Sequence, residues 1–295
     1  MALAGHDWRD MAMASGAARP LPTRTLPLAY PDDVALAWNR SFPEMACAAN
    51  AISLLMPYIE PYFARSIRGV LDQLDGPLRA RTEEYLRQEL AHQRQHRRFN
   101  DLLVAQHPGL VRLERMARRV FLGLTRRLSP RFNVAVVAAA ESAAFGIARW
   151  IDRHVDELFD DADPVVATLF LWHLAEEIEH KSAAYEVFEA VDGSRVRLSV
   201  ASGLILGLVI PFILVATVAM LWSQKRLRYP VTWFRLTRWA ISMAFTLLPT
   251  VASSLVPGHH PDQLADPPYL AQLLGSLDPA TGTIELFRPT VQPPP

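Results

Sequence analysis

Apolar residues recur at steps of three and four almost throughout residues 43–192, and the strict alternation of a half-buried strand is absent. This period predicts helices that each bury one face. Proline, glycine and capping residues divide the region into four long helices, with a shorter basic helix after the second. The expected helices span residues 45–75, 77–106, 110–128, 130–159 and 164–191. The pattern therefore predicts an all-α protein whose residues 43–192 form an antiparallel four-helix bundle.

Two apolar runs follow the bundle. Residues 198–222 are 25 consecutive positions without a charge, enough to cross a bilayer core of ~30 Å. Residues 239–261 form a second uncharged run, and basic clusters precede both runs, so a single crossing would place like charge on both sides. We therefore expect residues 193–258 to form a hydrophobic helical hairpin that is re-entrant or lies in the membrane interface. The alternative is a helix pair buried in the protein, and Gly203 with Gly207 suits close helix packing in either setting.

The two ends of the chain lack a clear period. Residues 1–42 contain several prolines and are expected to form an irregular arm that packs on the bundle. No charged region leads into an apolar stretch near the N-terminus, so no secretory signal peptide is predicted. Residues 259–295 are rich in proline and are expected to form an extended or mobile tail.

Composition narrows the class of protein. The 295 residues are 51% apolar and carry 30 basic and 30 acidic side chains, which excludes a wholly disordered chain and argues against nucleic-acid binding. A single cysteine, Cys47, excludes an intramolecular disulfide and suits a reducing compartment, so we expect a cytoplasmic location. Residues 193–261 carry seven basic and no acidic residues, so this segment is expected to attach to a membrane.

Two copies of Glu-x-x-His are the strongest chemical signal. Glu89 and His92 lie on the second predicted helix, and Glu177 and His180 lie on the fourth. A spacing of three residues projects both side chains from one helix face. One copy is typical of a solvated helix surface, whereas two copies on alternate bundle helices match the ferritin-like di-iron arrangement. Carboxylates in that arrangement offset the charge of two cations, and imidazoles supply nitrogen ligands.

The same arrangement requires one glutamate from each of the other two helices. Glu141 is the only charged residue in the apolar centre of the third helix. Glu60 is the first acidic residue after Glu44, which is the alternative for the first helix. Pro57 and Pro61 flank Glu60 and predict a kink there. An unpaired carboxylate is costly to bury, and a metal ion would remove that cost.

These motifs resemble a known family. The stretch from Asn50 to Glu60, the segment from Gln88 to Asn100 and the segment from Trp172 to Lys181 look like those of the bacterial ferritin-like "predicted metal-dependent hydrolase" family. The resemblance covers roughly residues 45–220. It implies a ferritin-like four-helix bundle with metal-dependent chemistry.

The fourth helix is also similar to a motif of the di-iron arylamine N-oxygenases, in which a histidine stands four residues before the glutamate of Glu-x-x-His. Carried over, this resemblance implies seven metal ligands, which are Glu60, Glu89, His92, Glu141, His173, Glu177 and His180. It leaves His96 and Glu176, together with Glu179, as groups that surround the ligands, and His96 as the best candidate for an extra ligand.

The leading functional hypothesis is a non-haem di-iron oxygenase or oxidase that holds two Fe ions and uses O2 to oxidise a small or hydrophobic substrate. Mn/Fe and Zn are the alternative metals. The alternative function is a two-metal hydrolase, and a third is a non-catalytic metal-binding protein associated with a membrane. The sequence assigns no catalytic residue beyond the ligands and no electron donor, and it leaves a homodimer open.

Overall fold

All regular secondary structure among the described residues is helical. The computed structural model describes residues 21–24, 26–276 and 286–287. Within these ranges the one β-type pairing is an isolated bridge between Asn39 and Ala162. The predicted all-α class is confirmed.

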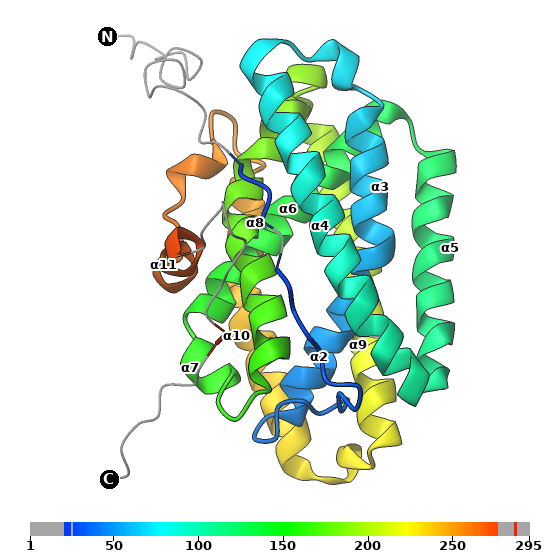
Figure 1. Cartoon of the computed structure of the whole chain (residues 1–295). Coiled ribbons are helices and arrows are strands. Elements are labelled where there is room, and N and C mark those ends of the chain that lie inside the picture. The colour runs from blue at the N-terminus through cyan, green and yellow to red at the C-terminus, as the bar shows by residue number, and fades with distance from the viewer. Residues whose placement is uncertain (1–20, 25, 277–285, 288–295) are drawn as a thin grey trace.

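A bundle with four helical positions forms the centre of the molecule (Figure 1). Two consecutive helices share the first position, and single long helices occupy the other three. They are α2 (Pro43–Ser53) followed by α3 (Met56–Arg68), α4 (Gly76–Gln106), α6 (Pro130–Asp152) and α8 (Pro164–Val191). Contacts of α3 with α4, α4 with α8, α8 with α6 and α6 with α3 close the ring. Each bundle helix therefore presents one face to a shared interior.

The first predicted helix, over residues 45–75, is broken into α2 and α3 and ends earlier than expected. Pro57 explains the break, because it has no N–H to donate to the carbonyl of Ser53 and its ring crowds that carbonyl. The side-chain amide of Asn100 donates to the same carbonyl, with an N–O distance of 2.8 Å. The interruption thus lies before Pro57 rather than around Glu60, and α3 continues through Pro61.

The third predicted helix, over residues 130–159, is also shorter than expected. α6 ends at Asp152, and a separate turn, α7 (Val155–Leu158), follows. The ring nitrogen Nδ1 of His154 lies 2.8 Å from the carbonyl oxygen of Trp150, the acceptor that a continuing helix would use. The helices expected over residues 77–106, 110–128 and 164–191 are confirmed within one residue at each end.

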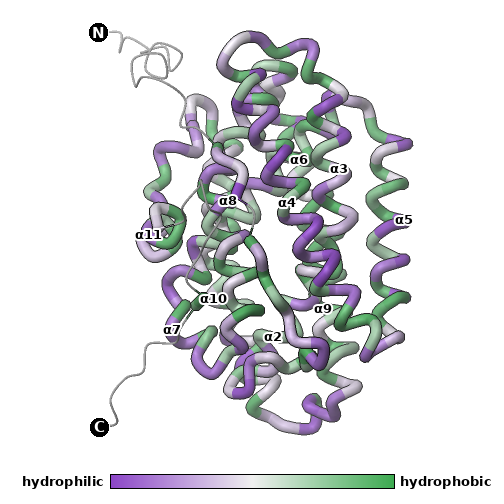
Figure 2. The backbone as a smooth tube through the Cα atoms, in the orientation of Figure 1, coloured by the Kyte–Doolittle hydropathy of each residue, from purple (hydrophilic) through white to green (hydrophobic). Residues whose placement is uncertain are grey.

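α5 (Val111–Arg127) lies outside the bundle and packs against α3. Hydrophilic and hydrophobic positions alternate along it in Figure 2, as expected for a helix with one face in solvent. Its buried positions are Glu114, Ala117 and Phe121, so only a narrow stripe contacts the bundle.

A hairpin of two long helices covers another side of the bundle. α9 (Arg195–Ser223) packs against α2 and α6, a short turn η3 (Arg226–Arg228) follows, and α10 (Pro230–Ser253) returns along α6. α10, the second helix of the hairpin, therefore starts before the apolar run at residues 239–261 and ends inside it. α6 and α9 are the two helices, among the described residues, that are long and apolar enough to cross a membrane. Close packing at Gly203 and Gly207 is absent within the described chain, where no atom lies within 4 Å of an added Cβ.

Residues 21–24 and 26–42 form an irregular segment that runs along α4 (Figure 1). Side chains of α4 hold its backbone over almost the whole length of the helix. The pairs are Leu21 with Glu84, Pro22 with Gln88, Leu26 with Gln95, Leu28 with Arg98 and Asp32 with Gln106. This part of the expected arm is irregular but closely held. Residues 1–20 lie outside the described ranges.

The part of the C-terminal segment that the structure describes is not extended throughout. α11 (Pro268–Ser276) packs on α8, with Leu270 and Leu274 buried one turn apart. Asp152 accepts a hydrogen bond from the Leu270 N–H at 2.9 Å, which satisfies an open donor at the start of this helix. The expected extended tail is therefore wrong for these residues, while 277–285 and 288–295 lie outside the described ranges.

Candidate metal centre

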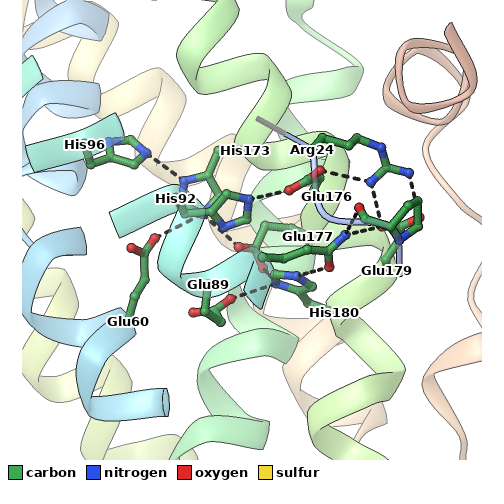
Figure 3. Close-up of polar contacts among 12 residues, drawn as sticks. Arg24, Glu60, Glu89, His92, His96, His173, Glu176, Glu177, Glu179 and His180 are labelled. Carbon is green, nitrogen blue, oxygen red and sulfur yellow. Dashed lines mark hydrogen bonds and ion pairs between the residues drawn. The ribbon is translucent and has the colours of Figure 1, made fainter. Parts of the chain in front are cut away.

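Seven glutamate and histidine side chains from four helices meet inside the bundle, and all of them except Glu141 are labelled in Figure 3. All are buried, and the most exposed residue of the set retains only 9% of its accessible surface. They are Glu60 on α3, Glu89 and His92 on α4, Glu141 on α6, and His173, Glu177 and His180 on α8. The structure thus brings together every residue of the predicted ligand set, and their role as metal ligands stays a prediction.

Helical spacing explains how α8 supplies three of these groups. His173, Glu177 and His180 stand at steps of four and three, so they share one face of the helix. Glu177 lies between the two imidazoles, with Oε1 2.8 Å from His173 Nε2 and Oε2 3.6 Å from His180 Nδ1. Both rings therefore direct one nitrogen toward the same carboxylate.

The ligand atoms form two groups that share one imidazole. The first comprises Glu89, His92, Glu177 and His180, and the second comprises Glu60, His92 and His173. Within each group the atoms that could bind a metal all lie within 4.8 Å of one another. Glu141 lies beside the first group, with Oε2 3.8 Å from His180 Nδ1. Two neighbouring positions for a cation fit this arrangement.

Several polar atoms at this centre have no hydrogen-bond partner among the described residues. They are both carboxylate oxygens of Glu60, one oxygen each of Glu89 and Glu177, and Nδ1 of His92 and His180. Buried polar atoms are almost always satisfied, because leaving one unpaired costs about 1–3 kcal/mol. Oxygen and imidazole nitrogen atoms are donors that Fe, Mn and Zn accept as ligands. The residues present therefore fit a metal centre.

The outer nitrogen of His92 faces an acid that is itself held in place. His92 Nε2 lies 2.8 Å from Glu176 Oε2, and Glu176 Oε1 accepts a hydrogen bond from the Arg24 guanidinium at 2.9 Å. Because that carboxylate can only accept, the neutral ring carries its proton on Nε2. The inward nitrogen, Nδ1, then presents a lone pair to the centre.

A second chain of hydrogen bonds orients His180. The Gln88 amide donates to Glu179 at 2.9 Å, so its carbonyl oxygen faces His180 Nε2 at 3.0 Å and accepts from it. Glu179 in turn accepts from Arg24 at 3.0 Å. In the neutral ring the lone pair again lies on Nδ1, which is 3.0 Å from Glu89 Oε1.

A third chain orients His173 through His96. The Asn100 amide donates to the Ser53 carbonyl, so the Asn100 oxygen accepts from the Ser53 hydroxyl at 2.6 Å. That hydroxyl then accepts from His96 Nδ1 at 2.8 Å, and His96 Nε2 accepts from His173 Nδ1 at 2.7 Å. In the neutral ring His173 Nε2 therefore presents its lone pair to the Glu177 and Glu60 carboxylates, and either a proton or a metal ion between them would satisfy both.

Burial and neighbouring charges shift the pKa values of several groups at the centre, upward for Glu60 and Glu141 and downward for Glu177. Burial, with nearby carboxylates, raises the pKa of Glu60 and of Glu141 well above the ordinary value. Burial opposes a charged His180, yet Glu177 and Glu89 raise its pKa well above the ordinary value. Protons and divalent cations compete for these atoms, so metal binding would release protons from the centre.

The groups expected around the ligands are placed by these contacts. His96 uses both ring nitrogens on other side chains, so it supports His173 and does not belong to either ligand group. Glu176 and Glu179 are buried against Arg24 rather than exposed. Glu44, the alternative to Glu60, pairs with Arg235 and Thr232 at the hairpin instead.

Three residues of the centre were not expected from the sequence. Arg24 comes from the irregular arm, where no periodicity marks a buried position. Gln88 and Tyr85 lie on α4 near Glu89, and the Tyr85 hydroxyl donates to Glu141 at 2.6 Å. Their spacing from the Glu-x-x-His of α4 was the one available signal, because positions four apart share a helix face.

A third group of Glu and His residues lies away from the bundle interior. It contains Glu186, His260 and Asp262 and is partly exposed. Arg81 donates to both oxygens of Glu186 at 2.8 Å, which accounts for that carboxylate as an ion pair. The interior groups, with unpaired atoms, are the better candidates for metal.

Comparison with known protein families finds a match over most of the chain. The family model described as "Predicted metal-dependent hydrolase" matches residues 22–265 of the chain. No curated protein and no solved structure matches it. The matched range includes the arm residue Arg24, all seven candidate ligands and the hairpin.

Proposed function

The chain belongs to the family of predicted metal-dependent hydrolases, and on this premise we propose that it is a hydrolase that uses a pair of divalent cations. One observation supports a pair most directly: besides the common His92, each of two neighbouring groups has potential ligand atoms of its own, from Glu89, Glu177 and His180 in one and from Glu60 and His173 in the other. The unpaired oxygens of Glu60, Glu89 and Glu177 add negative charge to both groups.

Each cation would have its own set of side chains. Glu89, Glu177 and His180 would hold one, Glu60 and His173 would hold the other, and His92 stands where either could use it. Divalent cations in such a site lower the pKa of a water molecule and polarise the bond to be cleaved. Glu141 is close enough to His180 to complete the first set.

The remaining side chains orient these ligands. Each of the three imidazoles has its outer nitrogen engaged, which fixes the ring and directs the other nitrogen inward. Arg24 bonds the carboxylates of Glu176 and Glu179, so these acids are charge-paired outside the ligand groups. Burial on all sides limits water at the centre, which strengthens its electrostatic interactions.

Oxygen chemistry is the second candidate function. Two Glu-x-x-His motifs with a further glutamate from each remaining bundle position form the ligand pattern of ferritin-like di-iron proteins. Glu60, Glu89, Glu141, Glu177 and the three imidazoles would hold a pair of Fe ions, which would pass electrons from an external reductant to O2 during oxidation of an organic substrate. The observation that favours this candidate is the buried Tyr85 hydroxyl on Glu141, a phenol close to the centre. The third candidate function is metal binding without catalysis.

Reconstitution of the metal-free chain separates these candidates. We expect equilibrium dialysis to give about two bound metals per chain, and Zn- or Mn-loaded protein to hydrolyse members of a panel of esters, amides and phosphoesters without O2. Oxygen from 18O-labelled water would then appear in the product. The variant Glu89→Gln should lose metal and activity, whereas Asp101→Asn, on the exposed side of the same helix, should retain both.

The competing results are equally specific. Hydrolysis absent with every metal, together with substrate-dependent O2 consumption and a coupled iron pair in the Mössbauer spectrum after Fe(II) loading, would replace the hydrolase proposal with the oxygenase one. Two bound metals with neither activity over the panel would support the non-catalytic candidate.

A further inference from the structure

Large apolar side chains are exposed mainly on the hairpin of α9 and α10. Of 17 exposed large hydrophobic residues in the described chain, 15 lie between Val196 and Val256. Phe245 is 80% exposed, Trp222 74% and Phe234 68%. Large exposed apolar patches mark contacts with proteins or membranes, whereas scattered single residues do not.

The inner face of the hairpin is fixed to the bundle along its whole length. Residues of α9 from Leu198 to Leu221 are buried at helical spacing, which leaves the opposite face outward. Charged bundle residues also contact α10, because Arg149 donates to Thr250 and Arg235 donates to Glu44. A hairpin inserted across a bilayer would take these charged contacts into hydrocarbon or break them. The contacts therefore favour a hairpin that lies along a surface.

Charge on the hairpin identifies the kind of surface. No acidic residue occurs between positions 193 and 261. The turn between α9 and α10 carries Lys225 and Arg228, both exposed, and the aromatic residues Trp222, Tyr229 and Trp233 stand on either side of it. Tryptophan and tyrosine prefer the membrane–water boundary, and basic residues near it attract anionic lipid headgroups.

We propose that the outer face of the α9–α10 hairpin docks in the plane of a membrane that contains anionic lipids. The apolar residues enter the boundary between headgroups and acyl chains, and the basic turn binds the headgroups. A second copy of the chain on this face is disfavoured by charge, because the exposed basic turn would find no acid on the matching hairpin. The docked face would anchor the bundle without a spanning helix.

Vesicle co-sedimentation of the full chain tests this proposal. We expect binding to vesicles of phosphatidylcholine with phosphatidylglycerol, and at least about 25-fold weaker binding after Lys225→Glu with Arg228→Glu, since each basic residue near the surface contributes about fivefold. The triple variant Trp222→Ser, Phe234→Ser, Phe245→Ser should lose at least tenfold. Its substitutions are at exposed positions, and circular dichroism checks that the helices are retained.

Matched controls locate the effect on the hairpin. Arg118→Glu with Arg119→Glu changes two exposed charges on α5, and Met116→Ser removes an exposed apolar residue there. Both should leave vesicle binding unchanged. If the α5 charge reversals abolish binding and the hairpin variants do not, the basic face of α5 is the docking site and the proposal is wrong.

Two further results would overturn the proposal. Absence of vesicle binding, with a dimer in analytical ultracentrifugation that the triple variant dissociates, would assign the face to a second copy. If the protein stays in the membrane fraction of the expressing cells after an alkaline carbonate wash, the hairpin spans the bilayer. A hairpin that lies in the membrane plane should be extracted by this wash.

Discussion

α6 and α9 have similar apolar character but opposite surroundings. Both are long and apolar enough to cross a bilayer, yet 78% of the most apolar window of α6 is buried and only 33% of that of α9. α6 contacts α3, α8, α9 and α10, so neighbours surround it. α9 contacts the bundle with one face only, and its other face carries exposed valine, leucine and isoleucine side chains.

The difference shows that sidedness of burial, and not apolar content, separates a core helix from a surface-docking helix. It also shows where a charge is informative. Glu141 is a carboxylate in the centre of the surrounded helix, and it lies beside His180 and Tyr85. The outward face of α9 has no charge between Leu198 and Trp222. A charge retained in a core has a partner there, and a face free of charge points to an apolar environment outside.

Placing the same acid in both helices would test this comparison most severely. Val137→Asp in α6 should destabilise the chain by about 4 kcal/mol or more, because the residue is fully buried and an aspartate there would lack a partner. Leu214→Asp in α9 should change the free energy of unfolding by less than about 0.5 kcal/mol, because 56% of Leu214 is already exposed. Urea denaturation of the purified variants measures both. Equal destabilisation would mean that the outer face of α9 is covered.

Removing the Glu141 carboxylate from the centre of α6 should have the next largest effect. Glu141→Gln should weaken metal binding by about 100-fold, since it removes a carboxylate that we propose as a ligand while retaining its shape. The same variant should raise the melting temperature of the metal-free chain, because burial disfavours the ionised carboxylate. Isothermal titration with Zn2+ and calorimetric melting give the two values. Unchanged affinity would remove Glu141 from the ligands.

A substitution at Arg24 tests the side chains that orient the imidazoles, Glu176 and Glu179, separately from the candidate ligands. Arg24→Gln should lower metal affinity by about 10- to 100-fold, because it frees Glu176 and Glu179 and so loosens His92 and His180. Arg118→Gln, an exposed arginine on α5, is the matched control and should have no effect. The number of metals bound at saturation should stay the same. A loss of one metal per chain would instead make the Arg24 network part of a binding site.

The smallest expected effect concerns the contact between α6 and α10. A Cβ at Gly146 would lie 2.9 Å from Leu247 Cδ1 and 3.3 Å from its Cα, so Gly146→Ala should cost about 1–2 kcal/mol. Gly203→Ala in α9 has no atom within 4 Å of the added Cβ, so helix propensity should dominate and stabilise the chain by up to about 1 kcal/mol. Thermal melting of the two variants side by side checks the opposite signs.

Much of the fold could be predicted from the sequence alone, because the spacing of apolar residues and the positions of prolines, glycines and capping residues are local properties of the chain. The helix over residues 164–191 begins at Pro164, and Asp163 caps it by accepting hydrogen bonds from two backbone N–H groups. Both residues are start signals that can be read from the sequence. The break before Pro57 and the end of α6 near His154 have local causes that the pattern did not place correctly, and residues distant in the sequence then support the outcome. Asn100 holds the carbonyl that Pro57 releases, and Asp152 supports the first turn of α11.

The candidate ligands of the metal centre and the side chains that orient them also differ in how far they could be predicted from the sequence. The inner side chains repeat at helical spacing, so Glu89, His92, Glu177 and His180 were visible as a pattern. Arg24 was not, because it lies on an irregular segment and meets Glu176 only after the whole bundle has assembled. Local pattern therefore predicted the atoms that face the centre but not the groups that orient them.

The closely held arm has a consequence for how the protein is made. Arg24 and Glu176 are 152 positions apart in the sequence, so during synthesis the Arg24 guanidinium must wait for the last bundle helix before it finds this partner. Contacts across such long separations slow folding. The hydrogen bonds that orient the imidazoles are therefore completed late in synthesis, and a metal ion would meet a fully oriented set of ligands only when the chain through α8 has been made.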